Sequence, residues 1–241
     1  MAMRICITND DGIQSEGLRR VVDWAATKGE VHVYAPKVEQ SAKSHAVEIH
    51  KPFEAKAANV PGAVTAYAVD STPADCIRFA VLGRHEHFDL VISGMNRGLN
   101  IGQDVMYSGT VSAAMEAVAL GMNALALSTD PDNFEAAMAH LDSVWAYICA
   151  HGGYAHCRLW NVNIPQNTTG EIHLTRQGGP YYSDDFAPEA NDMYRPMGKD
   201  IFTPSIHDDL DTDCVLRLRH ISLTPLTIDR TDWTALNALR K

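Results

Sequence analysis

Short apolar segments alternate with amphipathic ones over most of the chain. Apolar runs that predict β-strands lie at residues 4–8, 31–35, 65–69, 89–93, 124–128 and 159–164. Patterns with helical spacing lie between or beside them, at residues 16–28, 73–82, 110–120 and 131–150. Strands and helices in alternation require right-handed crossover connections between parallel strands. The pattern therefore predicts an α/β fold, with a doubly wound, mostly parallel, Rossmann-like sheet that carries helices on both faces.

The remaining segments fit this alternation less well. Residues 45–49 alternate briefly and suggest an excursion from the sheet as an antiparallel extension. Residues 178–213 are rich in Gly, Pro, Asp and Tyr with little periodicity, which predicts a long loop. Further strands, antiparallel to the others, are expected at residues 171–176, 215–219 and 221–223, with a short helix at 231–239.

Length and charge narrow the organisation of the chain. Its 241 residues can bury one large core, so we expect a single α/β domain with a core at residues 1–178 and a loop, hairpin and tail at 179–241. The formal net charge of −10 and the lack of a basic run disfavour duplex nucleic acid and anionic membranes as partners. The sequence has no signal-peptide pattern and no apolar span of membrane length, so we expect a cytoplasmic protein.

Two adjacent aspartates follow the first predicted strand, in the run Asn9-Asp10-Asp11-Gly12. Neighbouring side chains of a strand point to opposite faces, so Asp10 and Asp11 can meet at one ligand only where the chain turns, and Gly12 permits that turn. Taken alone, the run is typical of an ordinary turn. Because α/β proteins hold their chemistry at this edge of the sheet, Asp10 and Asp11 are also candidate catalytic residues.

Three more polar clusters follow predicted strands or begin a helix, at residues 40–45, 93–98 and 107–112. The ends of parallel strands share one edge, so we expect Ser41 and Asn96 to lie near the two aspartates. Two carboxylates, an amide and a hydroxyl form an all-oxygen ligand set, which suits Mg²⁺, Mn²⁺ or Ca²⁺. Such a cation would let this acidic protein bind an anionic substrate.

A phosphate site is expected beside this cation. Ser108-Gly109-Thr110 begins a predicted helix, whose first N–H groups and two hydroxyls suit a bound anion. The ordinary alternative is an N-cap, in which Ser108 or Thr110 caps its own helix, and the two roles can coexist. Arg97 is a candidate phosphate ligand or a solvated loop cation, and Asn9 joins the candidates from the aspartate turn.

Two other candidates have equally ordinary alternatives. His45 follows the Ser41 segment and is a candidate general acid, although a hydrogen-bonded structural histidine is the commoner role. Tyr181 and Tyr182 could stack on a base or pack within a hairpin.

The chemistry favoured by these residues is hydrolysis of a phosphate monoester by a metal-activated water, which Asp10 or Asp11 orients or deprotonates. One alternative makes Asp10 a covalent nucleophile, although enzymes of that kind usually separate their two aspartates by one residue. Another alternative is a non-catalytic, metal-dependent nucleotide-binding module.

Together these motifs resemble the SurE family of stationary-phase survival nucleotidases. The resemblance is nearly continuous over residues 3–127 and rests on Asn-Asp-Asp-Gly at 9–12, Gln-Ser at 40–41, Thr-Pro-Ala-Asp-Cys at 72–76, Ser-Gly-Met-Asn-Arg-Gly at 93–98 and Tyr-Ser-Gly-Thr-Val-Ser-Ala-Ala-Met-Glu at 107–116. It implies a metal-dependent phosphatase of nucleoside 5′- and 3′-monophosphates, with metal ligands at Asp10, Asp11, Ser41 and Asn96. It also implies a homodimer or homotetramer in which the C-terminal hairpin and tail reach a neighbouring subunit.

The chain departs from the family pattern in two places. Ser71 stands where the family commonly has Gly before Thr-Pro-Ala-Asp-Cys. Residues 179–185 read Gly-Pro-Tyr-Tyr-Ser-Asp-Asp, where the family usually has an Asp-Pro-Arg-Gly-Arg stretch. The second departure falls in the segment that the resemblance assigns to the oligomerisation arm.

Overall fold

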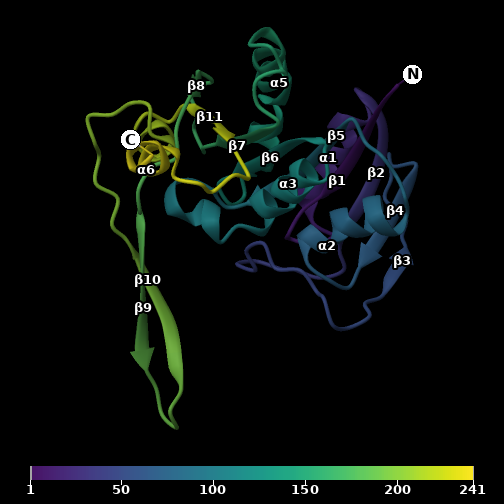
Figure 1. The fold of residues 1–241 in the computed structure, drawn as a ribbon, viewed down its shortest axis with the longest axis horizontal. Coiled ribbons are helices and arrows are strands. Elements are labelled where there is room, and N and C mark those ends of the chain that lie inside the picture. Colours follow the sequence, from purple (N-terminus) through teal and green to yellow (C-terminus); the bar gives the residue numbers. More distant parts are fainter. Residues whose placement is uncertain (1, 241) are drawn as a thin grey trace.

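A nine-stranded sheet forms the centre of the computed structural model, which describes residues 2–240 (Figure 1). The strand order is β3-β4-β2-β1-β5-β6-β7-β11-β8. The parallel strands are β1 (Met3–Thr8), β2 (Gly29–Pro36), β4 (Thr65–Val69), β5 (Leu90–Arg97), β6 (Asn123–Thr129) and β7 (Leu159–Ile164). Every one of them overlaps a predicted strand, and the mostly parallel α/β fold is confirmed.

Helices cover both faces of this sheet and enclose two separate cores. On one face lie α1 (Glu16–Ala25), α4 (Phe134–Met138) and α5 (Leu141–Ala150), and on the other lie α2 (Pro73–Arg78), the π-helical turn η1 (Phe79–Gly83) and α3 (Gly109–Ala119). Alternate strand residues supply the two cores, so that Ile5 and Ile7 of β1 pack on the first face and Cys6 on the second.

The order of the strands reverses between β1 and β5. Chain connections run from β1 outward to β2 and β4 on one side, and from β5 outward to β6 and β7 on the other. Such a switch point opens a crevice at the carboxyl ends of the strands, where doubly wound proteins bind their ligands. The aspartate turn leaves β1 at this point, and Asn96 and Arg97 end β5 beside it.

The antiparallel extension exists, but later in the chain than expected. Residues 45–49 form no strand, whereas β3 (Ala55–Ala57) pairs antiparallel with β4. Side-chain contacts hold the earlier segment instead, since Asp75 accepts the Glu48 N–H at 2.8 Å. Its apolar residue Ile49 is 73% exposed, so the alternation does not mark a buried face.

Two other predicted elements are wrong in detail. The helix expected at residues 131–150 is divided into α4 and α5, and the strand expected at 215–219 is instead the π-helical turn η3 (Asp213–Arg217). In η3 the adjacent residues Cys214 and Val215 are both buried, which a helical turn allows and an alternating strand does not.

The last strands of the sheet run opposite to the parallel ones, as expected. Strand β11 (Ile221–Leu226) pairs antiparallel with β7, and the edge strand β8 (Ile172–Leu174) pairs parallel with β11. A further 3-10 turn, η2 (Gly102–Met106), precedes α3.

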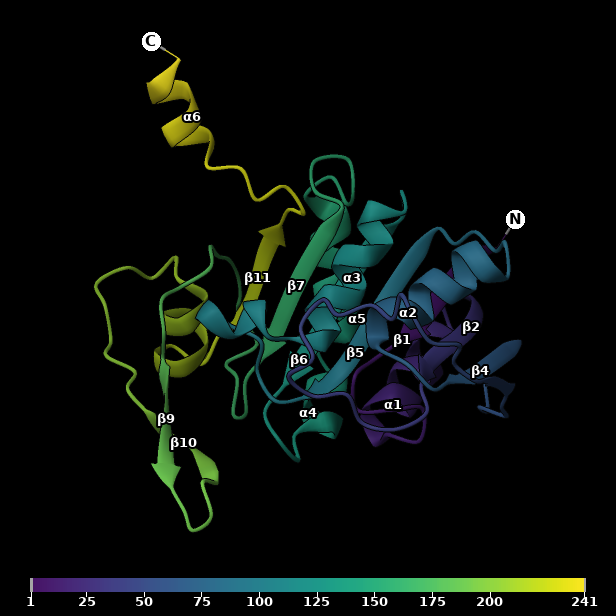
Figure 2. The same cartoon turned by 60° about the horizontal axis from the view of Figure 1, so that its bottom comes forward.

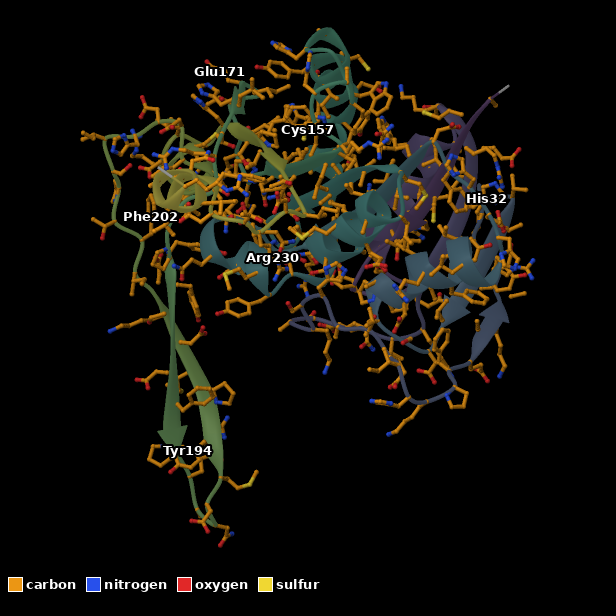
Figure 3. All side chains as sticks on the ribbon, in the orientation of Figure 1. His32, Cys157, Glu171, Tyr194, Phe202 and Arg230 are labelled. Atoms are coloured by element: carbon orange, nitrogen blue, oxygen red, sulfur yellow. The ribbon has the colours of Figure 1, made fainter. Side chains whose placement is uncertain are left out.

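A hairpin and a tail project from the body of the molecule. Strands β9 (Tyr182–Pro188) and β10 (Tyr194–Asp200) form a separate antiparallel pair, with Tyr194 near its far end (Figures 1 and 3). The expected hairpin is thus confirmed, although residues 178–213 are not the continuous loop predicted for them. Helix α6 (Trp233–Leu239) extends away from the sheet and buries no residue (Figure 2). No described helix is long and apolar enough to cross a membrane.

Candidate active site

Asp10 is buried at the start of helix α3 and is held there by Thr110. Its Oδ2 accepts the Thr110 N–H at 3.1 Å, and its Oδ1 accepts the Thr110 hydroxyl. Gly109 makes room for this contact, because a Cβ at that position would lie 2.9 Å from both Cβ and Oδ2 of Asp10. A side chain from β1 therefore occupies the N-terminus of α3.

A β-bulge in β5 brings Asn96 and Arg97 to the same edge. The pairing register between β5 and β6 shifts between Ser93 and Asn96, and Gly94 in the bulge has φ +136°. A Cβ on Gly94 would overlap the carbonyl oxygen of Leu127, so only glycine fits there. After the bulge, the Arg97 N–H donates to Oδ2 of Asp11 at 3.1 Å.

The loop that carries Ser41 is attached to both neighbouring segments. The Gln40 N–H donates to the carbonyl oxygen of Asp10 at 2.7 Å, and the Ser44 N–H donates to that of Tyr107 at 3.0 Å. The Ser41 hydroxyl is exposed and donates to Oε1 of Glu39 at 2.6 Å. Its oxygen lone pairs remain available to a cation.

Two adjoining cavities collect most of the candidate residues. One, of about 410 Å³, is lined by Asp10, Ser41, Asn96, Arg97 and Ser108 among others. The second, of about 420 Å³, is lined by Asp11 and Glu39 and shares Ser41 and Arg97 with the first. The structure thus brings the four predicted metal ligands into one region, and their role as ligands stays a prediction.

Hydrogen bonds and the nearby charge of Arg97 offset only part of the negative charge of the two aspartates. Burial raises the pKa of Asp10, and burial together with the charge of Asp10 raises the pKa of Asp11 to about 6. Across residues 2–240, no Lys, Arg or His side chain lies within ion-pair distance of either carboxylate. An all-oxygen donor set with unbalanced negative charge fits a hard divalent cation.

Several predicted phosphate ligands make structural hydrogen bonds. Asn9 donates to the Ser15 hydroxyl at 2.7 Å and closes the turn before α1. Ser108 is the N-cap of α3, accepting the Val111 N–H at 3.0 Å, which is the ordinary alternative for this residue. Thr110 uses both of its donors on Asp10, so they are not free for phosphate. The Arg97 side chain is 59% exposed and forms one exposed ion pair, with Asp132 at 3.3 Å, so its other donors can still reach a ligand.

His45 makes the contact of a structural histidine. Its Nε2 lies 2.8 Å from Oε2 of Glu116, whose other oxygen accepts from Arg78 at 2.9 Å. His45 is not among the residues that line the Asp10 cavity. The structure does not bring it to the aspartates.

Some residues of the Asp10 cavity carry no clear sequence signal. They are Leu99, Asn100, Asp104, Tyr107 and Asp184, of which only Tyr107 lies within a polar cluster noted in the sequence. Asn100 is held by two buried side chains of β7: Asn163 Oδ1 accepts its N–H at 2.7 Å, and Asn161 donates to its carbonyl oxygen at 2.8 Å. The sequence signal that could have pointed to this part of the cavity is the pair of asparagines, Asn161 and Asn163, within an otherwise apolar strand.

The two tyrosines at the root of the hairpin take different roles. Tyr181 packs inward, and its hydroxyl donates to Oδ2 of Asp104 at 2.7 Å. Tyr182 lines the Asp10 cavity with 47% of its surface exposed. Its ring lies over Gly198 of β10, where a Cβ would overlap it. Tyr182 is therefore the one placed to meet a ligand.

Comparison with known proteins decides the family. The model of the family described as Survival protein SurE matches residues 5–184. The chain belongs to the SurE family. Proteins named 5'-nucleotidase SurE from Desulforudis audaxviator and Thermococcus gammatolerans are 39% and 35% identical to this SurE chain, covering 99% and 95% of it and 97% and 91% of their own lengths. The crystal structure of the SurE protein from Aquifex aeolicus, 29% identical, superposes with a TM-score of 0.80 and 98% coverage of both chains.

The hold of Thr110 on Asp10 gives a first testable expectation for this SurE protein. Thr110→Val keeps the shape of the side chain but removes the hydroxyl that donates to Oδ1 of Asp10. The Asp10 carboxylate group is then held at Oδ2 only and can rotate. If Asp10 binds the predicted cation, we expect about 10- to 100-fold lower activity, typical of losing a residue that orients a metal ligand. Thr110→Ser keeps the hydroxyl and should stay close to wild type in steady-state phosphate release. Equal losses in both variants would assign the effect to packing instead.

Proposed function

We propose that this protein is a metal-dependent 5′-nucleotidase, which hydrolyses nucleoside 5′- and 3′-monophosphates to nucleoside and phosphate. The observation that carries the proposal is the pair Asp10 and Asp11, buried and partly buried, which forms no ion pair with any described residue and lies with Ser41 and Asn96 at the switch point of the sheet. Membership of a family whose curated relatives bear the name 5'-nucleotidase SurE supports the substrate class.

Different residues would bind the metal, bind the phosphoryl oxygens and accept the proton of the attacking water. A divalent cation, Mg²⁺ or Mn²⁺, held by Asp10, Asp11, Ser41 and Asn96 would polarise a phosphoryl oxygen and lower the pKa of a water molecule. Arg97, exposed at the same edge, is suited to pair with the remaining phosphoryl oxygens. Asp11 is more accessible than Asp10 and is the better candidate to accept the proton of the attacking water.

The hydrogen bonds of Asp10 argue against the covalent alternative. Both of its oxygens accept from Thr110, and the side chain is only 4% exposed. These two hydrogen bonds and the burial of the side chain leave neither oxygen free to approach a phosphorus atom. Attack by water therefore fits the geometry better than an aspartyl-phosphate intermediate.

The rest of the Asp10 cavity suits a nucleoside. Tyr107 and Tyr182, about half exposed, offer aromatic faces to a base. Asp104 and Asp184 line the same cavity and offer carboxylate oxygens to ribose hydroxyls. Aromatic and acceptor groups beyond the phosphate end favour nucleotides over simple phosphate esters.

We also infer that the protein assembles with copies of itself. The hairpin exposes Phe186 and Tyr194, and α6 exposes Trp233 and Leu239, without a core of their own. Apolar groups on projecting segments fit contacts with another subunit. Light scattering on the full chain should give the mass of a dimer or tetramer, and a purely monomeric mass would contradict the inference.

Phosphate release over a panel of substrates and metals tests the function. We expect hydrolysis of nucleoside monophosphates with Mg²⁺ or Mn²⁺, loss of hydrolysis in EDTA, and recovery when excess cation is returned. Undiminished turnover in chelator would refute the metal dependence. Tight nucleotide binding without product would instead favour the non-catalytic module. A single turnover in ¹⁸O-water should place the label in phosphate, whereas label in the enzyme would support covalent catalysis by Asp10.

Substrate recognition by Tyr182 can be tested separately. Tyr182→Ala should raise KM for a nucleoside monophosphate by about 5- to 20-fold, since stacking on one base contributes about 1–3 kcal/mol and this ring is half exposed. KM for ribose 5-phosphate should not change, because that substrate has no base. Tyr182→Phe keeps the aromatic ring and is the matched control, with an expected KM close to that of the wild type for both substrates. A similar rise for both substrates would mean that Tyr182 supports the cavity rather than the base.

A further inference from the structure

Two histidines and a glutamate cluster at the edge of the sheet, apart from the candidate active site. His173 lies in β8, Glu171, two residues earlier, directly precedes that strand, and His220 directly precedes the paired strand β11. Figure 3 labels Glu171 beside these two strands, on the opposite side of the body from the hairpin. Four strand spacings, about 19 Å, separate β8 from β5 of the candidate active site.

The three side chains already face one another. Nδ1 of His220 lies 2.9 Å from Nε2 of His173, and Oε2 of Glu171 lies 3.4 Å from the same Nε2. One potential ligand atom from each residue lies within 4.8 Å of the other two. Zinc–nitrogen bonds of about 2.0–2.1 Å in a tetrahedral site place neighbouring ligand atoms about 3.3 Å apart. The spacing of the cluster therefore needs little adjustment to enclose a cation.

The cluster is accessible but partly fixed by its surroundings. The side chain of His220 is 15% exposed and that of His173 is 36% exposed, while Glu171 is 66% exposed. The rings of the two histidines pack against each other, with centroids 4.4 Å apart. Two positioned imidazoles beside a flexible carboxylate form a site that an ion can enter from solvent.

We propose that Glu171, His173 and His220 bind a borderline divalent cation such as Zn²⁺, with water completing a tetrahedral site. Two imidazole nitrogens favour Zn²⁺ and similar transition metals over Mg²⁺, which prefers oxygen ligands. For both nitrogens to bind, the proton between them moves to the far nitrogen of its own ring, and the cation replaces the hydrogen bond. The site thus differs in chemistry from the all-oxygen set around Asp10.

The position of the site assigns it a clamping role. β8 is the edge strand and pairs with β11 across three residue pairs only. A cation shared by residues on both strands would hold this short pairing together. The chain continues from β8 to Gln177, which donates to the carbonyl oxygen of Gly102 at 2.7 Å, so the clamp also fixes a segment near the root of the hairpin.

Calorimetric titration of the full chain with Zn²⁺, in saturating Mg²⁺ to fill the oxygen site, tests the proposal. We expect one Zn²⁺ per chain and a higher melting temperature with Zn²⁺. His173→Gln and His220→Gln each remove a ligand of the cation. Their affinity for Zn²⁺ should therefore fall by more than the about 10- to 100-fold that is typical when a residue orienting a ligand is lost. His87→Gln, an exposed histidine of another loop, is the matched control and should bind as wild type does.

Further variants separate the two metal sites. Asp11→Asn should keep its Zn²⁺, because Asp11 belongs to the other site. Glu171→Gln alters only an exposed side chain and should weaken binding even if a histidine variant fails to fold. Equal Zn²⁺ uptake by wild type, His173→Gln and Glu171→Gln would overturn the proposal, as would loss of the ion in Asp11→Asn. Since the readouts are binding and melting, failure here is distinguishable from failure of the nucleotidase proposal.

Discussion

Phosphate release by Asp11→Asn should be at least about 10³-fold slower in kcat/KM than that of the wild type, a loss of about 4 kcal/mol in transition-state stabilisation. The amide keeps the size of the side chain but loses the negative charge and the proton-accepting oxygen. Steady-state kinetics with Mg²⁺ on a nucleoside monophosphate measure the effect. Activity close to that of wild type would remove Asp11 from the catalytic mechanism.

The same variant should be more stable than the wild type in chelator. The folded-state pKa of Asp11 is about 6, against an ordinary value of 3.8, so the folded protein holds this proton more tightly than the unfolded chain does. Stability therefore falls as pH rises from about 4 to about 6 and stays lower above that window. Asparagine removes this penalty, and we expect a melting temperature about 2–6 °C higher near pH 8 in EDTA.

A matched surface variant controls for charge alone. Asp192 lies in the turn of the hairpin at φ +57°. Asparagine tolerates this conformation well, so Asp192→Asn changes only the charge. It should change neither activity nor melting temperature. If Asp11→Asn melted below the wild type at alkaline pH in chelator, the burial of a charged Asp11 beside Asp10 would not be what limits the stability of the wild type.

Gly94→Ala should destabilise the fold by about 3 kcal/mol or more. Its new Cβ would overlap the carbonyl oxygen of Leu127 and approach the Leu127 Cβ to 3.1 Å, at φ +136°. Any relaxation of this clash must move the bulge that places Asn96 at the active site. Urea unfolding measures the stability, and metal titration of the surviving fold measures the displacement of Asn96.

Gly121 provides the control for backbone strain. It has φ +89°, and a Cβ added there would meet nothing within 4 Å, so Gly121→Ala should cost only the conformational strain of about 1–2 kcal/mol. The difference in unfolding free energy between Gly94→Ala and Gly121→Ala measures the cost of the clash between β5 and β6. Equal destabilisation would show that the Leu127 contact does not constrain the bulge.

The parallel part of the sheet could be predicted because its central strands are largely buried on both faces and its outer strand β4 is partly buried. Residues 65–69 and 159–164 coincide with β4 and β7 to the residue. Such strands read as compact apolar runs bounded by turn residues, a signal that does not depend on long-range contacts.

The hairpin and the divided helix gave no comparable signal. Every residue of β10 is exposed, so neither face carries an apolar period. Along the helical region the buried residues continue at spacings of three and four through the break: Phe134, Ala137, Leu141, Val144 and Ile148. A local turn that preserves this stripe cannot be detected from periodicity.

In the active site, the residues at the ends of strands could be predicted from the sequence, but their hydrogen-bond partners could not. The positions of Asp10 and Asn96 follow from strand order alone. That Thr110 would direct both of its donors to Asp10 depends on packing between residues 100 positions apart. Tyr182 enters the cavity only because the hairpin returns its root to the sheet, which no local pattern records.

The wall of the cavity at Asn100 has a consequence for how activity responds to the medium. The uncharged amide groups of Asn161 and Asn163 in β7 form hydrogen bonds with the backbone of Asn100. Dissolved ions screen exposed charges and leave contacts between buried neutral groups almost untouched. This side of the pocket is therefore expected to keep its shape across ionic strengths, and under the proposed function a salt effect on turnover would report the encounter of an anionic nucleotide with the cation and Arg97.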